Sequence, residues 1–398
     1  MAPAGDEPPP LQLSDFQTDT LRGTRGFVRV GRTRSGQWWL IGPDDRPFFA
    51  CGVQLEAAEL RTVTPERAAA WGLNTWVIAG GAPPAGWTGA WVASLSFRPA
   101  VEAMIRLQGV QVPDVFDPGW TRACHDRAAQ ACHVGLSDPR LIGWLPDADL
   151  QWAAAPAGLS RPTLLQICLS LEPSFAAYHA AWEFVLAAHG GDLAALAAAW
   201  EAALPNKESL RLLTRDDHAL GSAGYRHDDE RFTKEFARQY FSAVSAAIRA
   251  QDPAHLIIGA QPPGGPAAVG AGAAPLVDLL AVQPGAVISG PQLDAWSRDG
   301  TVPVLLTGYS WAGGGLEAAP GRTPLEHMLA RGRAALEAVV AHPAAVGYAW
   351  RDWCDLPGDR PPFGAGLVRV DGGNAREHTD LLTEINLGAA VRRRASRP

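Results

Sequence analysis

Residues 301–311 read "TVPVLLTGYSW", a short apolar run that ends in a glycine followed by aromatic residues. The run lacks the polar alternation of a half-exposed strand, so it predicts a strand buried on both faces. Such a strand would bring Tyr309 and Trp311 to a surface, with Gly308 where a strand end usually presents a working side chain. Seven similar runs occur at 48–54, 74–81, 91–97, 141–150, 255–261, 278–284 and 345–353.

The order of these runs predicts the fold class. Helical patterns lie between them: 229–251 has a continuous 3.6-residue period, and 323–342 begins with Thr323 at the N-cap and a proline next. Eight buried strands alternating with helices indicate an α/β fold, a (β/α)8 TIM barrel. A doubly wound sheet is the alternative, but its phosphate loop would need GxGxxG spacing, which "IAGGAPPAG" (78–86) lacks.

The segments at the two ends set the expected domain boundaries. The turn-forming stretches "RSGQ" and "PDDRP" predict an N-terminal β-hairpin ahead of the first barrel strand. We expect a disordered or extended segment over 1–25 and a single barrel domain over 26–388. The basic residues of 389–398 are expected to form a solvated tail.

Composition excludes several classes of function. The net charge is −7 with a pI of about 5.8, and no basic stripe precedes the last residues, which argues against nucleic-acid binding. The N-terminus lacks the features of a signal peptide, and no apolar stretch is long enough to cross a membrane. The five cysteines cannot all pair within one chain, which favours a reduced, cytoplasmic protein. A metal site would need a second group of ligands with spacing that matches Cys124, His125, Cys132 and His133, and the sequence has none. We therefore expect neither a metal nor a cofactor.

A family resemblance emerges from several segments taken in order. They are "GQWWLIGPDDRPFFACGV" (36–53), "GLNTW" (72–76), "DVFDP" (114–118), "DPRLIGWLPDADLQW" (138–152), "VPVLLTGYSW" (302–311) and "HPAAVGYAWRDWCDLP" (342–357). Together they resemble β-agarase-like and β-galactosidase-like glycoside hydrolases over Gly36 to Asn386. The resemblance implies a barrel of the clan whose two catalytic glutamates end strands four and seven, where a retaining mechanism holds the carboxyls about 5–5.5 Å apart.

At both catalytic positions this sequence departs from the family pattern. Asp149 stands at the acid/base position of strand four, and Ala148 replaces the asparagine beside it. Gly308 stands at the nucleophile position of strand seven and has no side chain with which to attack. An aspartate is one methylene shorter than a glutamate, and a displacement of about 1 Å can lower a rate about 100-fold. The resemblance therefore implies an impaired or repurposed site.

Further positions of the resemblance also depart, while a candidate ligand-binding surface remains. Gln261, Gln283 and Ala349 replace an arginine, an asparagine and a histidine of the family pattern. The flat ring of tryptophan suits the apolar face of a sugar ring. The chain has fifteen tryptophans, and we expect most of them in the core. The expected substrate-binding residues are Asp147, Trp152, Gln261, Gln283, Tyr309, Trp311, Trp350, Trp353 and Asp355.

Three functional hypotheses stay open from the sequence. The first is a catalytically impaired barrel that binds a small carbohydrate, as a sensor or regulatory partner. The second is an active glycosidase with Asp149 as acid and a relocated base, Asp352 or Glu172, at the wider spacing of inverting enzymes. Asp352 and Asp355 could instead hold loops by pairing with Arg351 or Arg360. The third is an inert structural or interaction barrel. The sequence leaves the oligomeric state open.

Overall fold

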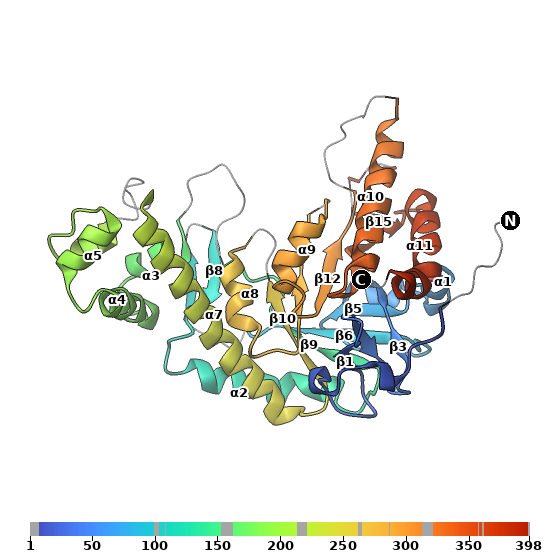
Figure 1. The fold of residues 1–398 in the computed structure, drawn as a ribbon, viewed down its shortest axis with the longest axis horizontal. Coiled ribbons are helices and arrows are strands. Elements are labelled where there is room, and N and C mark those ends of the chain that lie inside the picture. Colours follow the sequence, from blue (N-terminus) through green and yellow to red (C-terminus); the bar gives the residue numbers. More distant parts are fainter. Residues whose placement is uncertain are drawn as a thin grey trace.

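A computed structural model describes most of the chain: residues 8–98, 103–107, 109–152, 162–212, 221–261, 265–285, 287–312, 321–356, 358–359 and 362–396. A closed barrel of eight parallel strands forms its centre, and a helical lobe extends to one side (Figure 1). Residues 1–7 of the N-terminal segment, Arg360, and the last two residues of the basic tail lie outside the described residues.

All eight predicted strands form the barrel, which confirms the expected TIM-barrel class. The closed order is β10-β11-β12-β13-β4-β5-β6-β9, with every neighbouring pair parallel. The strands are β4 (Ala50–Glu56), β5 (Thr75–Ala79), β6 (Ala90–Leu95), β9 (Leu141–Pro146), β10 (Leu256–Gln261), β11 (Leu279–Val282), β12 (Val304–Tyr309) and β13 (Ala345–Trp350). Small and branched apolar side chains such as Val77, Val92, Ile258 and Leu305 form a buried cluster drawn from these strands.

An antiparallel sheet of three strands covers the amino-terminal end of the barrel. β1 (Arg29–Arg32) pairs with β2 (Trp38–Ile41), which pairs with β3 (Pro47–Phe48), so the predicted hairpin is confirmed and extended by one strand. Trp38 joins the buried cluster that includes the barrel strands, and its backbone N–H donates to the Pro343 carbonyl just before β13. The described part of the N-terminal segment forms two 3-10 turns (Leu13–Asp15 and Thr18–Thr20) rather than a plain extended chain.

The helices surround the barrel and build the lobe (Figure 1). Outside the lobe lie α1 (Pro65–Ala70), α2 (Trp120–Ala131), α7 (Ala223–Gln251), α8 (Ala267–Ala273), α9 (Gly290–Ser297), α10 (Pro324–Ala341) and α11 (Arg376–Ala395). The lobe comprises α3 (Leu164–Ser170), α4 (Ala176–Ala188), α5 (Leu193–Trp200) and α6 (Glu208–Leu212). The predicted helices are present, and Thr323 caps α10 by accepting from the Glu326 N–H. The long helix α7 contacts α2 and α8 as well as α3, α4 and α5, so it joins barrel and lobe.

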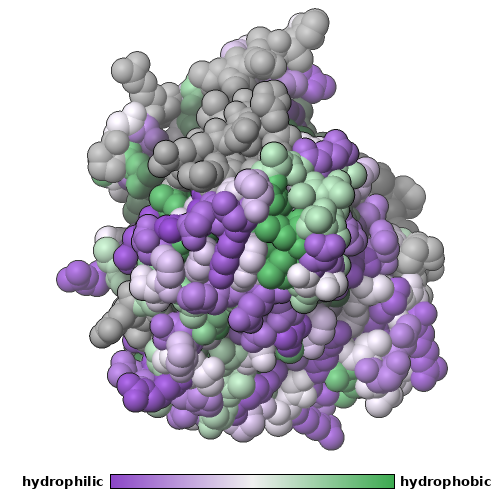
Figure 2. Space-filling view, turned by 90° about the vertical axis from the view of Figure 1, so that its left-hand side faces the viewer, coloured by the Kyte–Doolittle hydropathy of each residue, from purple (hydrophilic) through white to green (hydrophobic). Residues whose placement is uncertain are grey.

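Short elements complete the described chain. They are the 3-10 turns η3 (Glu59–Arg61) and η5 (Cys132–Val134), the hairpin β7 (Met104–Leu107) with β8 (Val110–Pro113), and the parallel pair β14 (Asp352–Cys354) with β15 (Gly366–Val368). Seen from the side of the lobe, the surface is mainly hydrophilic, with a compact hydrophobic area among polar side chains (Figure 2).

The prediction of a solvated tail over 389–398 is wrong for most of these residues. Helix α11 continues to Ala395, and its Arg393 is buried in the fold. The Arg393 side chain has no exposed surface. Its guanidinium donates to the carbonyls of Trp38 (2.7 Å), Val340 (2.9 Å) and His342 (2.8 Å). Burial lowers the pKa of Arg393 to about 9, so the group stays charged at neutral pH. Carbonyl dipoles and aromatic faces around it compensate the charge.

No helix within the described ranges is both long and apolar enough to cross a membrane. All five cysteines are free, and four of them are buried. Burial raises the pKa of the Cys51 and Cys132 thiols to about 12, so both stay protonated and behave as small apolar groups. In the part of the chain that the structure describes, no group of three or more histidine, cysteine or acidic side chains is arranged to hold a metal ion.

Candidate functional site at the barrel mouth

A cavity of about 520 Å³ opens at the carboxyl ends of several barrel strands. This is the end of a (β/α)8 barrel at which enzymes of this fold place their chemistry. Residues from β4, β5, β6, the β9 end and the β11 end share its wall. Residues of α2 and η5 complete the wall, whose polar side chains include Gln54, Glu56, Ser96, Arg98, Arg127, His133, Asp149 and Gln283.

Asp149, which the family resemblance places at the acid/base position of strand four, lies on this wall. It follows β9 through a turn in which the Leu150 N–H donates to the Asp147 carbonyl. Its side chain is 61% exposed and forms an ion pair with Arg98, which follows β6. The carboxylate is therefore accessible to a ligand and already has a cationic partner.

Gly308 of β12 does not itself line the cavity, but it lies next to two residues that do, Gln54 and Gln283. The pairing of β12 with β13 shifts register between Leu306 and Tyr309, and Gly308 takes a left-handed φ of 63°. A Cβ at this position would lie 3.7 Å from Oε1 of Gln54 and 3.8 Å from Cδ of Gln283, which is ordinary contact. The structure thus brings Asp149 and Gly308 to one mouth, and amides rather than carboxylates stand next to the glycine.

The two glutamines expected to contact substrate differ in position. Gln283 lines the cavity, and its Nε2 donates to the Ala148 carbonyl at 3.3 Å, which ties the end of β11 to the end of β9. Gln261 is 8% exposed and packs against Gly270 of α8, where an added Cβ would lie 2.3 Å from its Oε1. The cavity wall does not include Gln261. The structure therefore supports a position at the mouth for Gln283 and not for Gln261.

Asp147 is a structural residue in this conformation, which corrects its expected role in substrate binding. It is 3% exposed and accepts hydrogen bonds from Ser96 Oγ (2.9 Å), the Phe97 N–H (2.9 Å) and the Tyr240 hydroxyl (2.6 Å). Burial raises the pKa of Asp147, and the three hydrogen bonds act against that shift. The side chain holds the turn that presents Asp149.

The expected aromatic floor is also wrong, because its members are buried. Trp152 packs against Phe236, Tyr240 and Phe241, mostly edge to face. Of the aromatic residues predicted to touch a sugar, all are at most 1% exposed: Trp152, Tyr309, Trp311, Trp350 and Trp353. Every tryptophan except Trp182 and Trp296 is buried. Burying such large rings contributes more to stability than an exposed stacking face would, so tertiary packing decides their place.

The remaining carboxylates hold loops in place. Asp355 is 7% exposed, accepts from the Gly366 N–H at 2.9 Å and pairs with Arg369 at 2.8 Å. Asp352 pairs with Arg351 at 2.8 Å, as one of the sequence alternatives predicted. Glu172 pairs with Arg211 in the lobe. Neither Asp352 nor Glu172 lines the cavity, so the expected relocated base does not face Asp149 in this conformation.

His378 packs beside the buried tryptophans and yields a pH-dependent prediction. Its Nδ1 accepts from Trp311 Nε1 at 2.9 Å, its Nε2 contacts the Gly364 carbonyl at 2.8 Å, and burial lowers its pKa to about 4. In the unfolded chain, His378 takes up a proton near pH 6.5. The stability gained by keeping His378 neutral in the folded protein is therefore complete above that pH, and it is lost as the pH falls toward 4. The full loss is about 3 kcal/mol. Urea unfolding at pH 7 and pH 5 should show a smaller drop for His378→Gln than for the wild type. An identical drop in both would contradict the assignment.

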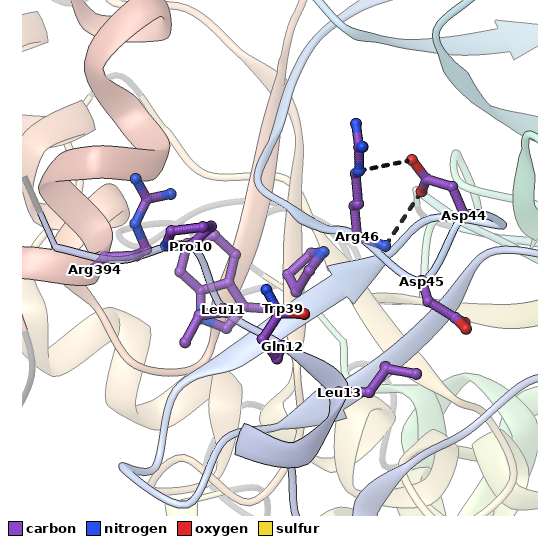
Figure 3. Close-up of a pocket in the computed structure, with 10 residues that line it drawn as sticks. Pro10, Leu11, Gln12, Leu13, Trp39, Asp44, Asp45, Arg46 and Arg394 are labelled. Atoms are coloured by element: carbon purple, nitrogen blue, oxygen red, sulfur yellow. Dashed lines mark hydrogen bonds and ion pairs between the residues drawn. The ribbon is translucent and has the colours of Figure 1, made fainter.

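A second cavity, of about 730 Å³, lies beside the N-terminal sheet that covers the amino-terminal end of the barrel, and Figure 3 shows the residues that line it. Its wall includes Leu11 and Leu13 of the N-terminal segment, Trp39 of β2 and Arg394 of α11. Arg46 and Asp44 in the turn before β3 form an ion pair beside it. The amino-terminal end of a barrel usually serves stability, and we assign no function to this cavity.

No family model and no curated protein matches the chain. Among solved structures it is similar to PfGH50B, with a TM-score of 0.75 and 16% identity, covering 96% of this chain and 70% of that chain. It is also similar to an exo-beta-agarase, with a TM-score of 0.73 and 17% identity, covering 97% of this chain and 68% of that chain. The chain has the fold of these glycoside hydrolases. A β-galactosidase from Rahnella sp. R3 matches less well, with a TM-score of 0.55 and 13% identity over 86% of this chain and 56% of that chain.

The glycoside hydrolase fold expected from the sequence is therefore confirmed, while identities this low say nothing about activity. Sequence reasoning missed two cavity residues that the fold makes prominent, Arg98 and Arg127. Arg98 could have been noticed, because it directly follows the third apolar run, where barrel enzymes place functional side chains. Arg127 sits within α2, and no local pattern distinguishes it from a surface arginine.

Proposed function

We propose that this protein binds a small carbohydrate at the barrel mouth and hydrolyses glycosides poorly or not at all. The observation that carries this proposal is the surroundings of Gly308, where the nearest contacts of an added Cβ would be the amides of Gln54 and Gln283. Two-carboxylate hydrolysis needs a nucleophile or a base opposite the acid, and Gly308 supplies neither. Removing a group that acts chiefly in the transition state lowers the rate more than it lowers ligand binding.

The cavity supports ligand binding over an inert barrel. Its volume of about 520 Å³ is in the range of small-molecule sites. Gln54, Gln283 and Asp149 offer the amide and carboxylate groups that hydrogen-bond sugar hydroxyls. A mouth closed by large side chains would have favoured the structural hypothesis, and the open cavity weighs against it.

An active glycosidase is the second candidate function, and the exposure of Asp149 favours it. A carboxyl group that is 61% exposed on the cavity wall can reach a glycosidic oxygen once a ligand is bound. Turnover of aryl glycosides that disappears in Asp149→Asn would establish this function. Turnover that the substitution leaves unchanged would exclude Asp149 as the acid.

We also propose that the protein works in a reducing, cytoplasmic setting. The five free cysteines, four of them buried, fit such a compartment.

Calorimetric titration with a panel of neutral mono- and oligosaccharides tests the main proposal. At least one member should bind, and Gln283→Ala should weaken that binding about 10-fold, which corresponds to about 1.4 kcal/mol for a lost hydrogen bond. Gln292→Ala is the matched control, since Gln292 is an exposed glutamine on α9, the helix that follows β11. Failure of every saccharide to bind would refute the proposal.

A further inference from the structure

Arg127 is a cation of the cavity wall without a charged partner among the described residues. It reaches from α2 to the end of β6, where its Nε donates to the Ser96 carbonyl at 2.7 Å. No ion pair to Arg127 occurs within the described part of the chain, whereas Arg98 pairs with Asp149. The side chain is half-buried, so its charge is less screened than at an open surface. Its two terminal nitrogens remain available for a ligand.

The geometry of Arg127 suits an anion. A guanidinium presents parallel N–H groups that pair with a carboxylate or a sulfate through two hydrogen bonds. The bond from Nε to Ser96 fixes the plane of the group before a ligand arrives, which reduces the entropy lost on binding. Arg98 lines the same cavity, and its partner Asp149 is exposed enough to yield to a ligand.

The rest of the site favours recognition by charge. The predicted stacking residues are buried, so within the described residues the cavity wall offers amides, hydroxyls, the imidazole of His133, the carboxylates of Glu56 and Asp149, and two arginines instead of an open tryptophan face. The carboxylates of Glu56 and Asp149 offset the charge of the two arginines on this wall, and Asp149 pairs with Arg98. The attraction of an anion therefore depends on the position of Arg127 and not on the net charge of the cavity.

We propose that Arg127, assisted by Arg98, binds the acidic group of a sugar, either the carboxylate of a uronic acid or a sulfate ester. This inference rests on the proposed carbohydrate-binding function and narrows its ligand class. The acidic group lies toward α2 and the end of β6, and the neutral part of the sugar lies toward Gln54, Gln283 and Asp149.

Titrations with matched ligands test the inference. D-glucuronate and D-galacturonate represent the carboxylate, galactose 6-sulfate represents the sulfate ester, glucose and galactose are the neutral parents, and inorganic sulfate is the bare anion. At least one acidic sugar should bind about 10-fold more tightly than its neutral parent in about 50 mM salt, and the preference should shrink as salt is added. Arg127→Gln should remove the preference, so that the acidic sugar binds no more tightly than its neutral parent. The control Arg122→Gln alters an exposed arginine on the same helix and should leave the preference unchanged.

The outcomes separate this inference from the proposed function. If neutral sugars bind as tightly as acidic ones, or if Arg127→Gln leaves the preference intact, the inference fails and the proposed function stands. If inorganic sulfate binds through Arg127 as tightly as any acidic sugar, the carbohydrate ligand is refuted. If no sugar binds, both proposals fail.

Discussion

Arg393→Ala is expected to lower the free energy of unfolding by about 3–5 kcal/mol, a large part of the roughly 5–15 kcal/mol typical of a domain. The substitution removes the donors of the carbonyls of Trp38, Val340 and His342 and leaves them buried. It also removes the cation that lies 5.0 Å from the ring centre of Trp39. Because these contacts join α11, β2 and the end of α10, their loss should loosen the amino-terminal end of the barrel. Urea unfolding followed by tryptophan fluorescence measures the effect.

Two comparison variants identify the cause. Arg376→Ala changes an exposed arginine of the same helix and should alter the free energy of unfolding by less than about 0.5 kcal/mol. Arg393→Lys keeps the charge but not the planar fork, so it should recover only part of the lost stability. If Arg393→Ala unfolds at the same urea concentration as the wild type, the buried contacts contribute nothing and the prediction is wrong.

The barrel was predictable because its signal is local. A parallel strand covered on both faces must be apolar along its length, so each of the eight runs is visible without knowledge of its neighbours. The same holds for Thr323, whose capping role follows from the residue type and the proline after it. The order of the runs along the chain then places Asp149 and Gly308 at the same end of the barrel.

The partners and surroundings of individual side chains were not predictable in the same way. A tryptophan at a strand end can face a ligand or the core, and for Trp311 and Trp350 the choice depends on His378, which lies far along the chain. The sequence "RRRASRP" looks like a solvated end, and nothing within it shows that the barrel offers carbonyls to one of its arginines. Such contacts arise from tertiary packing, which no local pattern encodes.

Asp147→Ala is the other substitution expected to have a large effect, about 2–4 kcal/mol in the free energy of unfolding. It leaves the Ser96 hydroxyl, the Phe97 N–H and the Tyr240 hydroxyl without their shared acceptor. Asp147 also has a left-handed φ of 41°, which aspartate and asparagine tolerate better than alanine. Because Asp147 holds the turn that presents Asp149, any ligand binding at the mouth should weaken as well. Urea unfolding and saccharide titration measure the two effects.

Asp147→Asn separates shape from charge at the same position. The amide can accept from the Phe97 N–H, present its NH2 to the Tyr240 oxygen and keep the backbone turn, so this variant should retain most of the stability that alanine loses. Burial raises the pKa of Asp147, so the stability linked to its neutral form is complete at low pH and is lost as the pH rises through the raised pKa. Asparagine has no such loss, and its stability relative to the wild type should therefore improve between about pH 4 and pH 7. Asp149→Ala, two residues away and exposed, should change stability by less than about 1 kcal/mol. If asparagine is as damaging as alanine at both pH values, the carboxylate charge rather than the hydrogen-bonded shape holds the turn, and the structural role assigned to Asp147 must be revised.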